Sequence, residues 1–182
     1  MKFEETKLAG CYIITPNVFG DSRGYFLESY NQHKFNQVIP GVTFVQDNES
    51  FSSYGVIRGL HYQQGNYAQA KLVRAVKGAV IDVAVDLRKN SKTFGQHVAV
   101  ELSEQNKRQL FVPRGFAHGF SVISESAIFA YKCDNLYAPE KEAGVLFKDQ
   151  QLAINWQIPE DKQIVSEKDL KFPEFSNAIY FG

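Results

Sequence analysis

The sequence predicts an all-β protein, and three observations support this. Fifteen Phe and nine Tyr occur among the 182 residues, and aromatic side chains fit the pleated surface of a sheet. Helical periodicity is scarce, whereas short apolar runs recur between Gly, Pro, Asn and Asp. Many short strands at this spacing are typical of a sandwich, a jelly roll or a closed barrel. We therefore expect one of these three all-β architectures, with a few short helices.

Eight segments carry the clearest strand signals. They are Gly24–Glu28, Val56–Tyr62, Lys71–Val76, Ala79–Leu87, Gln96–Glu101, Gln109–Val112, His118–Val122 and Ala127–Lys132. A short helix is expected within Ser29–Gln37, where Gly41 follows as a stop signal, and a helical turn is expected after Pro139.

The segment Ala79–Leu87 shows strict alternation between two sets of residues. One set is apolar throughout, and the other contains Asp82 and Asp86. This pattern predicts a half-buried strand, with the two acids on its open face. Lys77-Gly78 lies between two β runs and is a hairpin signal.

Apolar residues make up 44% of the chain and charged residues 22%, which is the balance of an ordinary globular protein. No repeat or linker-like stretch interrupts the sequence. We expect one domain over residues 1–182, with a barrel core at about residues 44–133. The N-terminal strands and a C-terminal helical or extended lobe are expected to pack on this core.

Lys and Arg equal Asp and Glu, at 20 each, so no broad positive field is available for a nucleic acid. Any bound anion must be held by a few placed cations, which favours a small ligand. The two cysteines, Cys11 and Cys133, form no CxxC pattern, and free thiols suit a reducing cytoplasm. The N-terminus lacks a signal-peptide pattern, and the most apolar run, Ala79–Val85, is too short to span a membrane.

Three segments concentrate side chains that could carry chemistry: Val56–Gln63, Pro113–Phe120 and Tyr131–Glu142. On a regular strand Arg58 and His61 would face opposite ways, unless Gly59 bends the strand.

Each candidate residue alone also has an ordinary structural explanation. His61 and His118 could be hydrogen-bonded wall residues, Lys71 a solvated strand end, and Tyr131 a core aromatic whose hydroxyl group is satisfied.

A metal site is not expected from these residues. Pro113, Gly115 and His118 fit a PxGxxH pattern, which resembles the second metal motif of cupins. The first cupin motif requires two histidines around one residue and a nearby glutamate, but His61 is followed by Tyr62 and Gln63. A transition metal normally takes three or four His, Cys or carboxylate ligands, and this set is too small.

The chain resembles the dTDP-4-dehydrorhamnose 3,5-epimerase family, whose members are cupin-like enzymes. This resemblance implies a cupin-like jelly-roll barrel with a few short helices. The matching motifs run in order along nearly the whole sequence: DSRGYFLESY at 21–30, FVQDNESFSSYGVIRGLHYQ at 44–63, KLVRAVKGAVIDVAVDLRKNSKTFG at 71–95, FVPRGFAHGFSV at 111–122, YKCDNLYAPEKEAG at 131–144 and SEKD at 166–169. The segment LFKD at 146–149 departs from the family's usual pattern.

The resemblance implies four catalytic roles. His61 looks like the general base that removes a proton from a carbon next to the C4 ketone. Asp169 looks like its partner, which orients the imidazole. Tyr131 looks like the acid that returns a proton from the opposite face of the sugar, and Lys71 like the residue that stabilises the enolate oxygen.

The resemblance also implies the residues that bind the substrate, a dTDP-linked 4-keto-6-deoxy sugar. These are Arg23, Glu28, Gln46, Asn48, Arg58, His118, Tyr137, Glu142 and Lys168. In the family, the residues matching Arg23 and Glu28 reach the site from a neighbouring subunit, so a homodimer is implied. Without the resemblance, Arg23 and Glu28 could simply form a solvated ion pair on the surface. Tyr137 matches an aromatic residue that stacks on the thymine ring.

The implied activity is epimerisation at C3 and C5 to give dTDP-4-dehydro-L-rhamnose, in dTDP-L-rhamnose biosynthesis, with no cofactor and no metal. Three alternatives remain open at this point. The chain could be a mono-epimerase that acts at C3 or C5 only, a non-catalytic cupin that binds a sugar nucleotide, or a metal-dependent cupin oxygenase.

Overall fold

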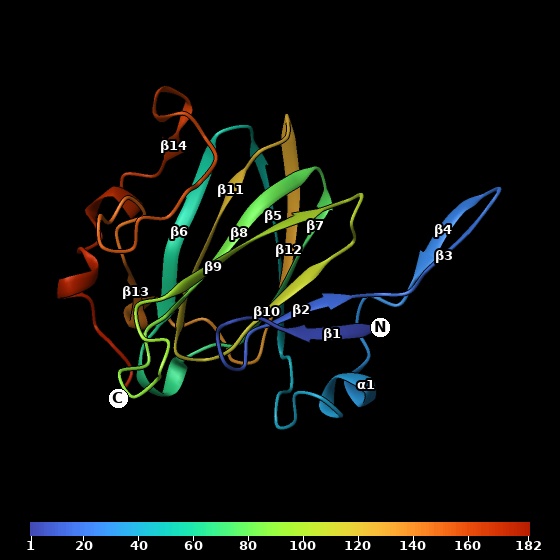
Figure 1. Ribbon diagram of the computed structural model, residues 1–182, viewed down its shortest axis with the longest axis horizontal. Helices are drawn as coiled ribbons and strands as arrows, with labels where there is room; N and C mark the ends of the chain where they lie inside the picture. The colour runs from blue at the N-terminus through green and yellow to red at the C-terminus, as the bar shows by residue number, and fades with distance from the viewer.

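Two six-stranded sheets that face each other dominate the computed structural model, which describes residues 1–182 (Figure 1). The first sheet has the order β1 (Lys2–Glu5), β2 (Tyr12–Thr15), β10 (Gln109–Val112), β7 (Lys71–Lys77), β12 (Ser126–Cys133) and β5 (Gln46–Ser53). The second has the order β13 (Glu142–Gly144), β6 (Val56–Gln63), β11 (Phe116–Val122), β8 (Ala79–Asp86) and β9 (His97–Ser103), with β14 (Ile164–Val165) beside β6. The predicted all-β class is confirmed, and the backbone pairing of strands stays within each sheet.

The eight predicted strands are all present, with ends that differ from the prediction by at most two residues. The helical segments are short, as predicted. Helix α1 (Gln32–Asn36) begins after Asn31, whose side chain accepts a hydrogen bond from the Lys34 amide. The turn predicted after Pro139 is the 3₁₀ turn Pro139–Lys141, and the other 3₁₀ turns are Gly65–Tyr67, Glu160–Lys162, Asp169–Lys171 and Phe175–Asn177.

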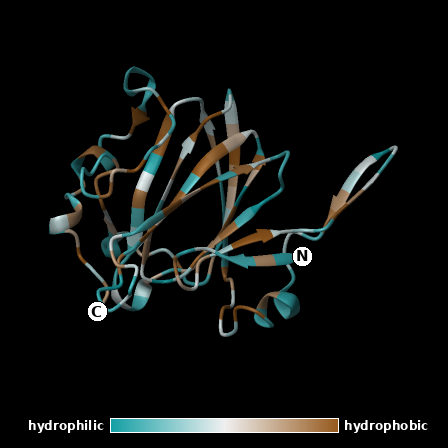
Figure 2. Ribbon diagram, in the orientation of Figure 1, coloured by the Kyte–Doolittle hydropathy of each residue, from teal (hydrophilic) through white to brown (hydrophobic).

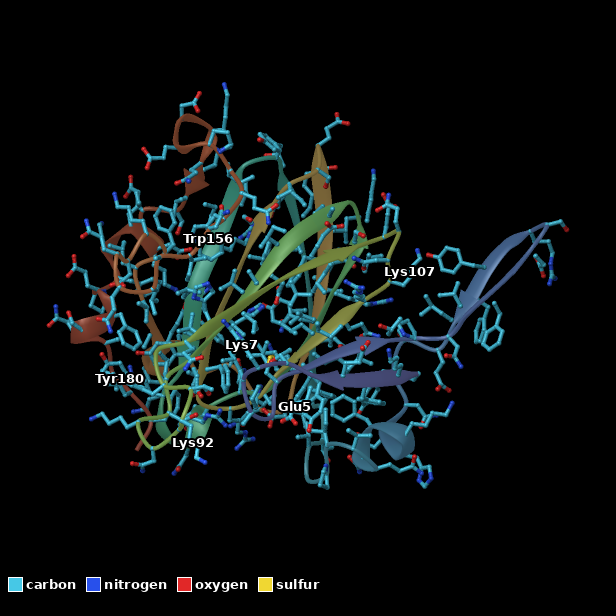
Figure 3. The ribbon with its side chains drawn as sticks, viewed as in Figure 1. Glu5, Lys7, Lys92, Lys107, Trp156 and Tyr180 are labelled. Carbon is cyan, nitrogen blue, oxygen red and sulfur yellow. The ribbon has the colours of Figure 1, made fainter.

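Strand β8 is buried on both faces, so the prediction that it is half-buried was wrong. Its Val80 and Ala84 pack into the core between the two sheets. Its Ile81, Val83 and Val85 pack on the other side in a second core, to which the C-terminal segment adds residues such as Phe147 and Phe175. Trp156, which Figure 3 labels, belongs to the same core. The two acids of β8 are therefore sealed inside the protein and must be paired there.

The two buried acids of β8 are satisfied by different partners. Asp86 accepts hydrogen bonds from Arg88, Ser91 and Thr93 in the following loop. Burial opposes ionisation of Asp86, but these hydrogen bonds lower its pKa to about 2. Asp82 pairs with His118 of the neighbouring strand β11.

Lys77-Gly78 does not form a hairpin, which corrects the prediction. Strand β7 belongs to the first sheet and β8 to the second, so the chain crosses between the sheets at Gly78. Gly78 has a φ of 73°, and a Cβ at this position would lie 2.0 Å from the Ser126 carbonyl oxygen. Only glycine fits this turn without displacing the backbone of β12.

A hairpin of β3 (Val18–Asp21) and β4 (Gly24–Leu27) projects away from both sheets (Figure 1). Phe19 and Phe26 face each other across its strands and are 62% and 69% exposed. Lys107, labelled in Figure 3, donates from its ammonium group to the Tyr25 hydroxyl at 2.8 Å. The hairpin thus presents large apolar side chains that the rest of this chain does not cover.

None of the helices combines the length and the apolar character that crossing a membrane requires.

Gly78→Ala should lower the free energy of unfolding by about 3 kcal/mol or more, because a positive φ and a backbone clash act together. Urea denaturation measures this change. Gly41→Ala is the matched control, since Gly41 has a φ of 80° but nothing near its Cβ position. The control should lose only about 1–2 kcal/mol, and equal losses in the two variants would contradict the clash.

Candidate active site

One cavity of about 250 Å³ opens between the two sheets, and the predicted base, acid and cation all line it. His61 projects from β6 of the second sheet, whereas Lys71 and Tyr131 project from β7 and β12 of the first. The other lining residues are Gln46, Asn48, Tyr62, Gln63, Gln69, Cys133, Tyr137 and Glu142. The imidazole and the phenol therefore stand on facing walls of the same space.

Gly59 bends β6 and so sets the direction of His61. Its φ is 126°, and the pairing between β6 and β11 shifts register at this point. A Cβ on Gly59 would lie 2.6 Å from the Gly119 Cα, so the two strands approach too closely for any other residue. In Figure 2 hydrophobic and hydrophilic segments alternate along β6. Gly59 therefore breaks the regular strand alternation between Arg58 and His61.

Asp169 holds His61 by a hydrogen bond between Oδ1 and the imidazole Nε2, at 2.9 Å. Its other oxygen accepts the Gly59 backbone N–H at 3.0 Å. Burial favours the neutral acid, but the hydrogen bonds from His61 and Gly59 outweigh it and lower the pKa of Asp169. Because the ionised carboxylate can only accept a hydrogen bond, the imidazole hydrogen lies on Nε2. Nδ1 has no hydrogen-bond partner in the protein and is therefore able to accept a proton.

Tyr131 and Lys71 lie close together on the opposite wall, with the ammonium 5.8 Å from the centre of the phenol ring. Burial raises the pKa of Tyr131, so its hydroxyl stays protonated at neutral pH and can donate a proton. Burial lowers the pKa of Lys71, while Cys133 and the carboxylates of Asp82 and Glu142 act in the opposite direction. Burial has the larger effect, so Lys71 is a poorly hydrated amine in the cavity wall rather than a solvated strand end.

Glu142 links Tyr137 and Lys168 at the edge of the cavity. The Tyr137 hydroxyl donates to one oxygen of Glu142 at 2.5 Å, and the Lys168 ammonium lies 2.6 Å from the other. Burial alone would raise the pKa of Glu142, but the contacts with Lys168 and Tyr137 have the larger effect, so the pKa is lowered. Three of the predicted substrate contacts therefore form one connected group.

The remaining predicted contacts divide into near and distant residues. Gln46 and Asn48 line the cavity and share a hydrogen bond at 3.0 Å. Arg58 is exposed, and its guanidinium donates to the Ser52 hydroxyl. His118 is directly opposite His61 in the β6–β11 pairing, but it is buried and does not line the cavity.

Arg23 and Glu28 lie on or beside the projecting hairpin and are not brought to this cavity within one chain. Arg23 pairs with Asp21 at 2.6 Å and its side chain is 87% exposed. Glu28 pairs with Lys34 at 2.8 Å. Within a single chain both residues make surface ion pairs.

No group of three or more His, Cys, Asp or Glu side chains lies close enough to hold a metal ion. His61 and His118 each bind a carboxylate of their own instead, Asp169 and Asp82 respectively.

Sequence reasoning missed several residues of the site. Gln63 follows His61 by two positions on β6, so strand alternation alone places both on one face. Cys133 follows Tyr131 in the same way on β12. Gln69 lies in a loop, and no sequence signal indicated that it lines the cavity.

A family profile for dTDP-4-dehydrorhamnose 3,5-epimerase matches residues 5–177. The chain belongs to this family. A dTDP-4-dehydrorhamnose 3,5-epimerase of Shigella flexneri is 50% identical, over 100% of this chain and 99% of its own length. The Pseudomonas aeruginosa enzyme of the same name is also 50% identical, with the same coverage.

Solved structures of this epimerase family have the same fold. The dTDP-4-dehydrorhamnose 3,5-epimerase of Elizabethkingia anophelis aligns with a TM-score of 0.93 at 57% identity, over 97% of both chains. The Legionella pneumophila dTDP-6-deoxy-D-glucose-3,5-epimerase, solved with dTDP-4-keto-L-rhamnose, aligns with a TM-score of 0.93 at 45% identity, over 97% of this chain and 93% of its own. A 3'-monoepimerase from Streptomyces bikiniensis, ChmJ, aligns with a TM-score of 0.87 at 30% identity, over 94% of this chain and 86% of its own. The chain is therefore an epimerase.

Asp169→Asn should lower kcat at least about 100-fold, because an amide can hold the imidazole in the wrong tautomer and does not stabilise the imidazolium. Steady-state kinetics measures this loss.

The same variant, Asp169→Asn, tests the charge of Asp169 through the free energy of unfolding. Since the folded pKa lies below the usual value of 3.8, the ionised carboxylate stabilises the fold above that pH and loses this effect as the pH falls. The stability difference between wild type and variant should therefore shrink in acid, and a difference that does not change with pH would contradict an ionised Asp169.

Proposed function

We propose that this epimerase inverts C3 and C5 of dTDP-4-dehydro-6-deoxy-D-glucose, giving dTDP-4-dehydro-L-rhamnose for dTDP-L-rhamnose biosynthesis. One observation carries the proposal: His61 and Tyr131 face each other from different sheets across one cavity that also contains Lys71. Inversion by proton transfer needs a base on one face of the sugar ring and an acid on the other. The name and bound ligand of the Legionella relative support this choice of substrate.

In each half of the reaction, the His61 Nδ1 takes the proton from the carbon next to the C4 ketone. The electrons of the broken C–H bond move into an enolate, and its oxygen gains negative charge. The Lys71 ammonium stabilises that oxygen, an effect worth about 3–4 kcal/mol for one well-placed donor. The Tyr131 hydroxyl then protonates the carbon from the opposite face. Between the two halves, His61 releases its proton to water and Tyr131 takes one up from water. C3 and C5 both flank C4, so one set of groups then serves both centres, and no electrons leave the sugar.

Asp169 makes His61 an effective base. Its carboxylate fixes the tautomer in which Nε2 carries the hydrogen, and it stabilises the imidazolium that forms when Nδ1 accepts the proton. The hydrogen bond from Gly59 to the second oxygen keeps the carboxylate in place. Asp169 thus acts through His61.

Charged and planar groups around the cavity suit the nucleotide part of the substrate. Arginine guanidinium groups pair well with phosphate oxygens, and Arg58 of this site is exposed and available. Tyr137 lines the cavity and is half-exposed, as a ring that stacks on thymine should be. Gln46, Asn48, Glu142 and Lys168 supply further polar contacts to the substrate. His118, the remaining residue in the implied set, is buried against Asp82 behind the cavity wall, so it supports the wall rather than contacting the substrate.

Arg23 and Glu28 contribute to binding in a homodimer, where the hairpin of one chain reaches the cavity of the other. The exposed Phe19 and Phe26 support this arrangement, since their own chain leaves them uncovered. Both cysteines are buried and unpaired, which supports a place in the reducing cytoplasm. Residues 1–182 act together as one domain, because the C-terminal segment supplies both Asp169 and part of a core.

His61→Ala should lower turnover at least about 100-fold, because it removes the general base. The measurement is incubation with dTDP-4-keto-6-deoxyglucose in D₂O, followed by NMR. The wild type should incorporate deuterium at both C3 and C5, and His61→Ala at neither. His33→Ala is the matched control, because His33 lies on the surface helix α1 away from the cavity, and it should behave as wild type.

Other results of the same experiment separate the remaining functions. Deuterium at only one carbon in the wild type would indicate a mono-epimerase, the activity named for ChmJ. No exchange at all would indicate a sugar-nucleotide-binding protein or a different chemistry. Wild-type rates in His61→Ala would remove the assignment of the base.

A mixing experiment tests whether Arg23 acts across the dimer. Arg23→Ala should raise KM about tenfold or more, since it removes a charged contact. Co-expression of Arg23→Ala and His61→Ala chains should restore activity, because mixed dimers then contain one complete site. If Arg23 serves its own chain, no mixed dimer has a complete site and co-expression restores nothing.

A further inference from the structure

Gln63 is a buried polar residue of the cavity wall for which the mechanism above has no use. It ends strand β6 and is only 4% exposed. It lies two residues after His61, so both side chains point from the same face of the strand into the cavity. Its neighbour across the β6–β13 pairing is Glu142.

One hydrogen bond determines how the Gln63 amide is oriented. The Ala138 backbone N–H donates at 2.9 Å to the Gln63 side chain, so the acceptor must be the amide oxygen. The amide nitrogen is thereby turned the other way, and it has no hydrogen-bond partner in the protein. Ser50 Oγ is the only fully buried side-chain N or O atom that has no hydrogen-bond partner. Because the Gln63 amide nitrogen also has no partner, it cannot be fully buried. Two N–H donors of Gln63 are therefore open to the cavity.

The oxygen of Gln63 also helps to fix the loop that carries Tyr137. The Tyr137 N–H donates to the Gln46 side-chain oxygen at 3.1 Å, and the next N–H, of Ala138, donates to Gln63. Two glutamine oxygens thus hold two successive peptide groups. One N–H of the Gln46 amide is already bonded to Asn48, whereas neither N–H of the Gln63 amide has a partner in the protein.

We propose that Gln63 is a positioning residue with two functions, one for each end of its amide. The oxygen anchors the Tyr137 loop, and the nitrogen donates a hydrogen bond to an oxygen of the sugar in the bound nucleotide. The sugar is the partner because Gln63 shares its strand face with His61, which must reach the sugar carbons. This inference rests on the proposed function, since it requires a sugar nucleotide in the cavity.

Two substitutions at Gln63 separate the functions. Gln63→Glu keeps an oxygen for the Ala138 N–H but removes the donor, whereas Gln63→Met removes both. Gln69→Glu is the matched control for added charge: Gln69 lines the same cavity, but its amide nitrogen already donates to the Asn135 carbonyl at 2.8 Å. The measurements are KM and kcat for the sugar nucleotide, the Kd of dTDP alone, and the thermal unfolding midpoint.

Gln63→Glu should raise KM roughly 10-fold to 100-fold, because a ligand oxygen loses its donor in a desolvated site. Its affinity for dTDP should stay within about twofold of wild type, because the loop anchor remains. Gln63→Met should show the same rise in KM and also bind dTDP more weakly. Gln69→Glu should raise KM clearly less than Gln63→Glu does.

Three results would overturn the inference. A wild-type KM in Gln63→Glu would leave Gln63 as a loop anchor only. If Gln63→Glu lost dTDP affinity by as large a factor as its KM rose, the Gln63 donor would contact the nucleotide rather than the sugar. If Gln69→Glu raised KM as much as Gln63→Glu does, the added negative charge would explain the effect. Failure of the proposed function is a separate result, because the wild-type protein would then catalyse no exchange in D₂O. The thermal midpoint identifies any variant that has lost its fold.

Discussion

The Asp169 carboxylate makes the two contacts on which the site depends. One oxygen binds the His61 imidazole, 108 residues away in the sequence, and the other binds the Gly59 N–H at the bend of β6. These bonds fix the C-terminal segment to the strand that carries the base. The same segment covers the outer face of the second sheet with Phe147, Trp156 and Phe175. The catalytic arrangement and the second hydrophobic core are therefore completed by one stretch of chain.

The facing sheets determine what the cavity can do. Because His61 and Tyr131 come from different sheets, the two groups are held on opposite sides of any ring that lies between them. A cavity within one sheet face could not offer this geometry. The cost is a polar zone inside the protein, where Lys71, Gln63 and Tyr131 lack full hydration. Such groups keep their places because core packing on both sides of the second sheet holds the strands rigid.

Strand patterns predicted every strand of seven or eight residues except β5. The residues of β5 that face inward are Gln46, Asn48, Ser50 and Ser52, which face the polar zone rather than an apolar core. The hydrophobic signal on which strand prediction relies is therefore absent there.

The turn at Lys77-Gly78 was wrongly predicted as a hairpin for a different reason. A tight turn has the same sequence pattern whether the chain returns to its own sheet or crosses to the other. Pairing with distant strands decides between these outcomes, and local sequence does not contain that information. The roles of His61, Lys71 and Tyr131 came from resemblance, because no spacing along the chain shows that three strands meet at one cavity.

The most direct test of an acid and a base on opposite walls is the fate of deuterium in Tyr131→Phe. Without the phenol, His61 should still remove a proton and return a deuteron from the same face when the reaction is run in D₂O. Recovered substrate should therefore contain deuterium at a carbon next to the ketone but keep its original configuration. Formation of the inverted product at the wild-type rate, or substrate recovered without any deuterium, would contradict the arrangement.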